Sequence, residues 1–173
     1  MRNCLSGRLP LAALVAALFL ASLQVHAADA VRASLDISKA GPRTVEPQTE
    51  QAILRDYRFA WSSMAQALEF NTADPLEGPF TGEAKKWLSE QVAGQRQTNL
   101  ISRYENQNHK LQAIFYAPEG DVIELHDTAE YQLQVLDGQK AVHDERVVVR
   151  YVVLMTPAAD RWVVRQLQAV PQF

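Results

Sequence analysis

Residues 122–138 of the chain read VIELHDTAEYQLQVLDG, and this stretch decides the fold. The odd positions from Ile123 to Val135 are mostly apolar, whereas the even positions between them are Glu, His, Thr and Gln. A period of two is typical of a strand with one buried face. Asp137-Gly138 then predicts a hairpin turn. We therefore expect residues 121–136 to form a strand whose odd side chains face the core.

The residues after the turn, 141–155, form a second alternating stretch that carries Arg146 and Arg150 at even positions. A two-residue loop would turn these arginines onto the apolar face, and burying them unpaired would cost several kcal/mol. We therefore predict a three-residue loop, 136–138, with Gly138 in the left-handed conformation. This loop pairs odd positions with odd positions and brings Glu124 beside Arg150.

Two helical stretches precede the strands. In the first, apolar residues recur every three or four positions after a possible N-cap at Thr49, and the turn-rich segment 71–79 ends it. The second begins after Thr81, and its pattern resumes at Leu100, Ile101 and Tyr104. Further strands are expected at 111–117 and 161–170. The sequence thus predicts an α+β fold, with N-terminal helices packed on a curved antiparallel sheet of about four strands.

The first 27 residues have the layout of a secretory signal peptide. Arg2 and Arg8 precede the apolar run LPLAALVAALFLASLQV (9–25), and small residues follow at Ala27 and Ala28. The alternative is a retained membrane anchor, but the run is shorter than the roughly 20 apolar residues of a spanning helix. We predict cleavage near Ala27, a flexible linker over 28–48 and a single domain over 49–173. The chain is then exported, to the periplasm or outside the cell, with no stable membrane span after cleavage.

Composition excludes several classes of protein. The 173 residues include 17 basic and 20 acidic side chains, which gives a formal charge of −3. Cleavage removes Arg2, Arg8 and the single cysteine, Cys4, so that the mature charge is 15 − 20 = −5. Without a basic excess, nucleic-acid binding is not expected. Without a thiol, the mature chain has no disulfide bond and no thiolate chemistry.

Three segments together resemble the nuclear-transport-factor-2-like superfamily of cone-shaped domains. These are the helical RDYRFAWSSMAQAL (55–68), the central VIELHDTAEYQLQVLDG (122–138) and the final YVVLMTPAADRWVVRQLQAV (151–170). The resemblance covers roughly residues 49–170. It implies a sheet wrapped around the first helix, a cavity at the wide end of the cone, and a sheet-to-sheet homodimer as one form of assembly. Members include isomerases, dehydratases, transport adaptors and domains without known chemistry.

One departure from that family bears on function. Its enzymatic branches usually have a short strand or hairpin between the helices, and none is predicted here. The resemblance therefore implies an interaction domain of the branches in which the helices come first. Fold resemblance alone does not establish a function.

Six residues are candidates for lining a pocket on the core side of the sheet. Asp127 lies in mid-strand among apolar neighbours, and Tyr131 follows it on the same face. This pair resembles the acid and phenol of isomerase members, and a buried carboxylate can transfer protons. The structural alternative is a carboxylate bonded to a tyrosine hydroxyl or to helix N–H groups. The other candidates on this face or packed against it are Trp61, His143, Glu145 and Tyr151.

No catalytic residue, metal site or cofactor is assigned from the sequence. His126 and His143 fall on opposite faces in the predicted register, His109 is expected to be solvated at a strand start, and no HxH or HExxH spacing occurs. We expect an exported, non-catalytic binding or assembly module for an unknown protein partner. The alternatives are an isomerase- or dehydratase-type enzyme using Asp127 and Tyr131, and a carrier of a small apolar ligand.

Overall fold

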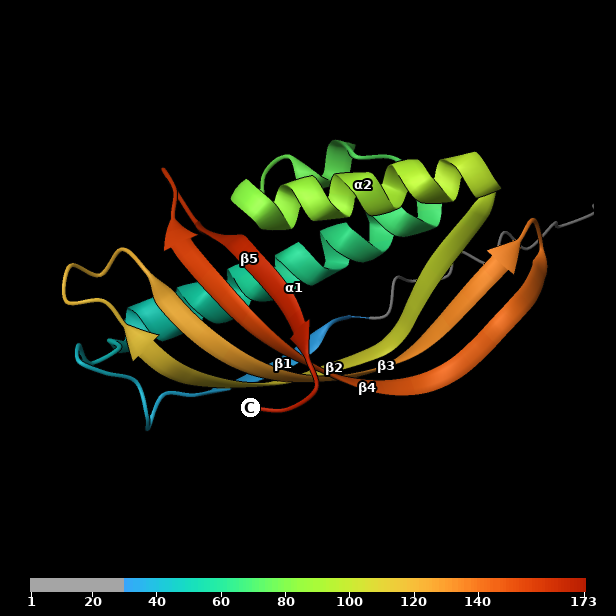
Figure 1. Cartoon of the computed structure of the whole chain (residues 1–173). Coiled ribbons are helices and arrows are strands. Elements are labelled where there is room, and N and C mark those ends of the chain that lie inside the picture. Colours follow the sequence, from blue (N-terminus) through green and yellow to red (C-terminus); the bar gives the residue numbers. More distant parts are fainter. Residues whose placement is uncertain (1–29) are drawn as a thin grey trace, which may run out of the picture.

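The computed structural model describes residues 30–173, which form one mixed sheet with two α-helices on its concave face (Figure 1). In chain order the elements are β1 (Arg32–Asp36), α1 (Pro47–Phe70), a short 3-10 helix (Asp74–Leu76), α2 (Gly82–Thr98), β2 (Leu100–Tyr116), β3 (Ile123–Asp137), β4 (Lys140–Pro157) and β5 (Trp162–Val170). The sheet order is β1-β2-β3-β4-β5, with β1 parallel to β2 and all other neighbours antiparallel. The predicted α+β architecture is confirmed, but the sheet has five strands, and it is mixed.

The additional strand lies in the segment that we predicted to be a flexible linker, 28–48, and for residues 32–36 that prediction is wrong. Strand β1 pairs with β2 from Arg32 opposite Asn108 to Asp36 opposite Gln112. Farther on, Gly41 O accepts a hydrogen bond of 2.7 Å from Tyr116 N, and Val45 packs in the core. The folded domain therefore begins well before Thr49. A strand of only five residues, paired with a distant segment, gives too short a pattern to recognise in the sequence.

Helix α1 follows the predicted apolar stripe. Its side chains Ile53, Tyr57 and Trp61 are almost fully buried against the sheet, and each contributes about 1.5–3 kcal/mol of hydrophobic free energy. The helix begins earlier than predicted, with Glu46 as N-cap and Pro47 in the first turn, where the missing proline N–H has no helical partner to lose. The Thr49 cap is therefore wrong.

The predicted helical pattern over Leu100 to Tyr104 is also wrong, because β2 begins at Leu100. Helix α2 ends when Asn99 adopts a left-handed conformation with φ 60°, a common way to end a helix. The chain then pairs with β3, from Leu100 opposite Asp137 to Glu105 opposite Gln132. Backbone pairing with a neighbouring strand thus overrides the local helical spacing.

The β3–β4 hairpin pairs odd positions with odd positions, as predicted, but by another route. The turn has two residues, Gly138 and Gln139, and a bulge at Val142 restores the parity, so that Asp127 lies opposite Tyr151. Gly138 has φ 59°, the predicted left-handed conformation. The expected proximity of Glu124 and Arg150 is wrong, because these residues lie opposite Leu154 and Thr128, respectively.

A second bulge interrupts the pairing of β2 with β3. Glu105 lies opposite Gln132 and Asn108 opposite Glu130, so two residues of β2 face the single residue Tyr131. The first of the two, Asn106, has φ 54°. Between this bulge and a further register shift after Ala113, the odd residues of β2 face the helices, including His109, Leu111 and Ala113. Beyond that shift the parity reverses, so that Tyr116 is buried and Phe115 is exposed. The bulge therefore sets which β2 side chains enter the core.

The predicted signal peptide, residues 1–27, lies outside the described residues. Within residues 30–173, none of the helices is both long enough and apolar enough to span a lipid bilayer.

Candidate functional site

Asp127 is at the centre of a buried polar cluster that joins three elements. It points from β3 toward the helices and has no solvent-exposed surface. Its Oδ2 accepts a hydrogen bond of 2.6 Å from the hydroxyl of Tyr57 on α1, and lies 2.8 Å from Nδ1 of His109 on β2. An ionised carboxylate can only accept, so this arrangement assigns the imidazole hydrogen to Nδ1.

His109 is fully buried, and the expectation that it is solvated at a strand start is wrong. Its ring lies 4.3 Å from the ring of Trp61, centroid to centroid, and meets Tyr57 edge-on at 5.6 Å. Within the described residues, His109 Nε2 and Asp127 Oδ1 have no hydrogen-bond partner. The sequence did contain a signal for this burial, since His109 has the same parity as Leu111 and Ala113.

Tyr131 and Asp127 lie on the same face of β3, as predicted, but the hydrogen-bond partners of Asp127 are Tyr57 and His109. The hydroxyl of Tyr131 lies 3.0 Å from the hydroxyl of Tyr151, the β4 residue that lies opposite Asp127, and the ring of Tyr131 packs at 5.0 Å on Tyr104. Burial raises the pKa of Tyr104, Tyr131 and Tyr151 above the ordinary value. Burial also raises the pKa of Tyr57 well above that value, and the negative charge of Asp127 adds to the shift. These phenols are therefore held as neutral hydrogen-bonding groups.

The six predicted pocket residues fall into two groups. Asp127, Tyr131, Tyr151 and Trp61 meet in the buried cluster, where the Trp61 ring lies 5.4 Å from that of Tyr151. His143 and Glu145 lie near the exposed tip of the β3–β4 hairpin. Their side chains are 48% and 62% exposed and their Nε2 and Oε2 atoms are 3.4 Å apart. The structure therefore does not bring this second pair to Asp127.

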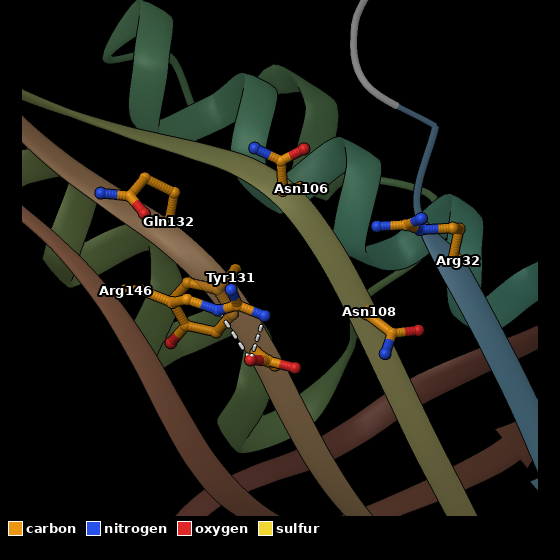
Figure 2. A pocket seen from close by; sticks show the side chains of 7 residues that line it. Arg32, Asn106, Asn108, Tyr131, Gln132 and Arg146 are labelled. Atoms are coloured by element: carbon orange, nitrogen blue, oxygen red, sulfur yellow. Dashed lines mark hydrogen bonds and ion pairs between the residues drawn. The ribbon is translucent and has the colours of Figure 1, made fainter.

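Two hollows lie mainly on the outer face of the sheet, the face turned away from the helices. The first, of about 350 Å³, surrounds the β2 bulge (Figure 2); it is lined by Arg32, Asn106, Asn108, Glu130, Tyr131, Gln132 and Arg146. The second, of about 440 Å³, lies beside Lys110, His126 and Phe173, where the Phe173 ring stacks on the imidazole at 4.3 Å. Asp127 lines neither hollow.

No group of three or more His, Cys, Asp or Glu side chains within residues 30–173 is arranged to hold a metal ion. His126 lies on the outer face, 3.3 Å from a carboxylate oxygen of Glu124, whereas the buried His109 has Asp127 as its carboxylate neighbour. The polar groups that meet at Asp127 in the core are therefore a carboxylate, an imidazole and a phenol, joined through Oδ2 of Asp127.

Comparison with protein-family models and with curated protein sequences gives no match. Among solved structures, the chain is similar to the intermembrane-space region of the chloroplast protein ARC6, with a TM-score of 0.60 and 13% sequence identity. The match covers 75% of this chain and 98% of that one. Similarity at this level of identity shows a shared fold. It does not carry the activity or the partners of one protein to the other.

Proposed function

We propose that the chain is an exported, non-catalytic binding or assembly module. The observation that carries this proposal is the burial of Asp127. The carboxylate has no exposed surface, both of its contacts use the same oxygen, and neither hollow reaches it. A group that performs acid–base chemistry must come within hydrogen-bond reach of its substrate. The burial of Asp127 favours a structural role for the cluster over the enzymatic alternative.

Exposed apolar side chains on the surface support a role in binding. Val148 and Val142 on β4 are 57% and 53% exposed, and Phe70 and Trp87 protrude from the helices. Single exposed apolar residues are common on protein surfaces and need no explanation. On β4, however, they belong to the part of the strand that extends beyond β5, because β5 pairs only with residues 150–157. This free edge of β4 is the surface that we expect to contact a partner.

Membership of the nuclear-transport-factor-2-like superfamily is part of the same proposal. The curved sheet with α1 along its concave side supports it (Figure 1). Export rests on the N-terminal sequence pattern. It is tested by N-terminal sequencing of the chain recovered from the periplasm or the medium, where a first residue at Ala28 is expected. Recovery of the uncleaved chain in the membrane fraction would instead identify an anchor.

In-cell crosslinking followed by mass spectrometry tests the binding role. Val148→Asp, which places a charge on the exposed face of β4, should remove the crosslinked partner. Tyr131→Phe changes the buried cluster by one hydroxyl and should leave the partner in place. Circular dichroism checks that both variants are folded. If Tyr131→Phe loses the partner and Val148→Asp keeps it, the binding surface is not the free edge of β4, and the buried cluster takes part in function.

A further inference from the structure

The outer-face hollow at the β2 bulge has an unusual charge arrangement for an acidic protein. Arg32 on β1, Asn108 on β2 and Glu130 on β3 lie opposite one another in a single cross-strand row. Arg146 on β4 reaches diagonally into this row, and its Nε lies 2.7 Å from Oε1 of Glu130. The hollow therefore contains two guanidinium groups and one carboxylate.

The two arginines differ in whether they form an ion pair. Both Nε and Nη2 of Arg146 contact Glu130 Oε1, so these two charges neutralise each other. Arg32 makes no ion pair with any residue of the described part of the chain. One positive charge is left over at the rim of the hollow. In a chain of net negative charge, this excess is local to the site.

The remaining lining suits an oxygen-rich ligand. Asn106 and Asn108 bring side-chain amides, which both donate and accept hydrogen bonds. The amide nitrogen of Gln132 already donates to the carboxylate of Asp144. Figure 2 shows Arg32 and Arg146 on opposite sides of the opening, with the two asparagines on β2 between them. Guanidinium groups bind planar carboxylates through paired hydrogen bonds. A volume of about 350 Å³ accommodates a small molecule or one or two side chains of a peptide.

We propose that this hollow binds a carboxylate-bearing ligand, with Arg32 as its charged anchor and the amide of Asn108 as a hydrogen-bond partner. Glu130 limits the affinity, because it occupies Arg146 and repels an incoming anion. This site adjoins the free edge of β4, since Glu130 lies opposite Val148. It does not rest on the proposed function, because the titration below measures binding of a carboxylate with no partner protein present, so its failure leaves the role of Val148 to be decided by the crosslinking experiment.

The test is a ¹⁵N NMR titration of residues 28–173 with two probes, citrate and a blocked tetraglutamate peptide, at constant ionic strength. We expect saturable shifts confined to the backbone amides around Arg32, Asn108, Glu130 and Arg146. Citrate alone shifting these signals would identify a free small carboxylate as the ligand class. The peptide shifting them at lower concentration would identify acidic side chains of a protein.

Three variants distinguish binding in this hollow from a nonspecific charge effect, because each should change the affinity for the probe in a different way. Arg32→Gln should weaken probe binding by about tenfold or more, since it removes a charge-assisted pair. Glu130→Gln should strengthen it several-fold by releasing Arg146. Arg165→Gln, an exposed arginine of β5 outside the hollow, is the matched control and should change nothing.

The NMR spectra themselves report whether each variant is folded. Shifts that grow linearly without saturation, or an equal loss of binding in Arg32→Gln and Arg165→Gln, would overturn the proposal. A weaker response in Glu130→Gln would overturn the role assigned to that carboxylate.

Discussion

Replacing Asp127 by alanine should destabilise the fold strongly, and the structure gives the size of the effect. The substitution removes the acceptor of two buried hydrogen bonds, from the Tyr57 hydroxyl at 2.6 Å and from His109 Nδ1 at 2.8 Å. Each donor left unsatisfied in the core costs about 1–3 kcal/mol. With two such donors, we expect a loss of about 2–6 kcal/mol. The loss is large beside a typical domain stability of about 5–15 kcal/mol.

The double variant Tyr57→Phe/Asp127→Ala decides whether the cluster acts as one unit. Removing the Tyr57 hydroxyl takes away one of the two donors that Asp127→Ala leaves without a partner. The double variant should therefore be about 1–2 kcal/mol more stable than the sum of the two single losses. Urea denaturation followed by tryptophan fluorescence measures this, since Trp61 packs on His109. Additivity within about 0.5 kcal/mol would refute the shared network.

Three further predictions concern other parts of the fold. The pKa is raised in four tyrosines, Tyr57, Tyr104, Tyr131 and Tyr151. Above about pH 10 the free energy of unfolding should fall by about 1.4 kcal/mol per pH unit for each of them, because the unfolded chain releases protons that the folded chain retains. Their tyrosinate absorbance should therefore rise together with the loss of circular dichroism, and not before it. Asp56→Ala should cost about 1–3 kcal/mol in urea denaturation, since Oδ2 of this buried residue accepts the Trp162 backbone N–H at 2.7 Å. The exposed Asp160→Ala is its control and should leave the urea midpoint nearly unchanged, because exposed ion pairs contribute little to stability. Gly138→Ala should cost about 1 kcal/mol, through the left-handed φ of 59° alone, because no atom lies within 4 Å of the added Cβ; an unchanged midpoint would show that the turn shifts to accept alanine.

The sequence predicted those parts of the fold in which one face of an element is buried along its whole length. The stripe of Ile53, Tyr57 and Trp61 fixed the buried face of α1, and the alternation around Asp127 fixed that of β3. The same alternation required odd positions of β4 to face odd positions of β3. The alternation did not predict how the chain achieves this odd-to-odd pairing. A three-residue loop, and a two-residue turn followed by a bulge at Val142, bury the same side chains.

The parts that the sequence did not predict depend on pairing between distant segments. Strand β1 forms because its backbone pairs with that of β2. Its sequence, RASLD, does not by itself indicate a strand. Residues 100–105 fit a helical spacing, but β3 lies beside them. The parity that His109 shares with Leu111 and Ala113 was a signal for its burial, but the sequence did not show where in β2 that parity begins. The β2 bulge at Asn106 decides which residues face the core, and a bulge leaves no clear period in the sequence.

The fully buried carboxylate of Asp127 has a physical role in the fold. Asp127 ties together α1, β2 and β3 through a single oxygen atom. If β3 slipped by one residue, its whole set of inner side chains would exchange with Glu124, His126 and Thr128 on the outer face. Tyr57 and His109 would then lose their acceptor, at a cost greater than the loss of apolar contacts alone. The cluster thus penalises the wrong register, which explains a fully buried carboxylate without invoking catalysis.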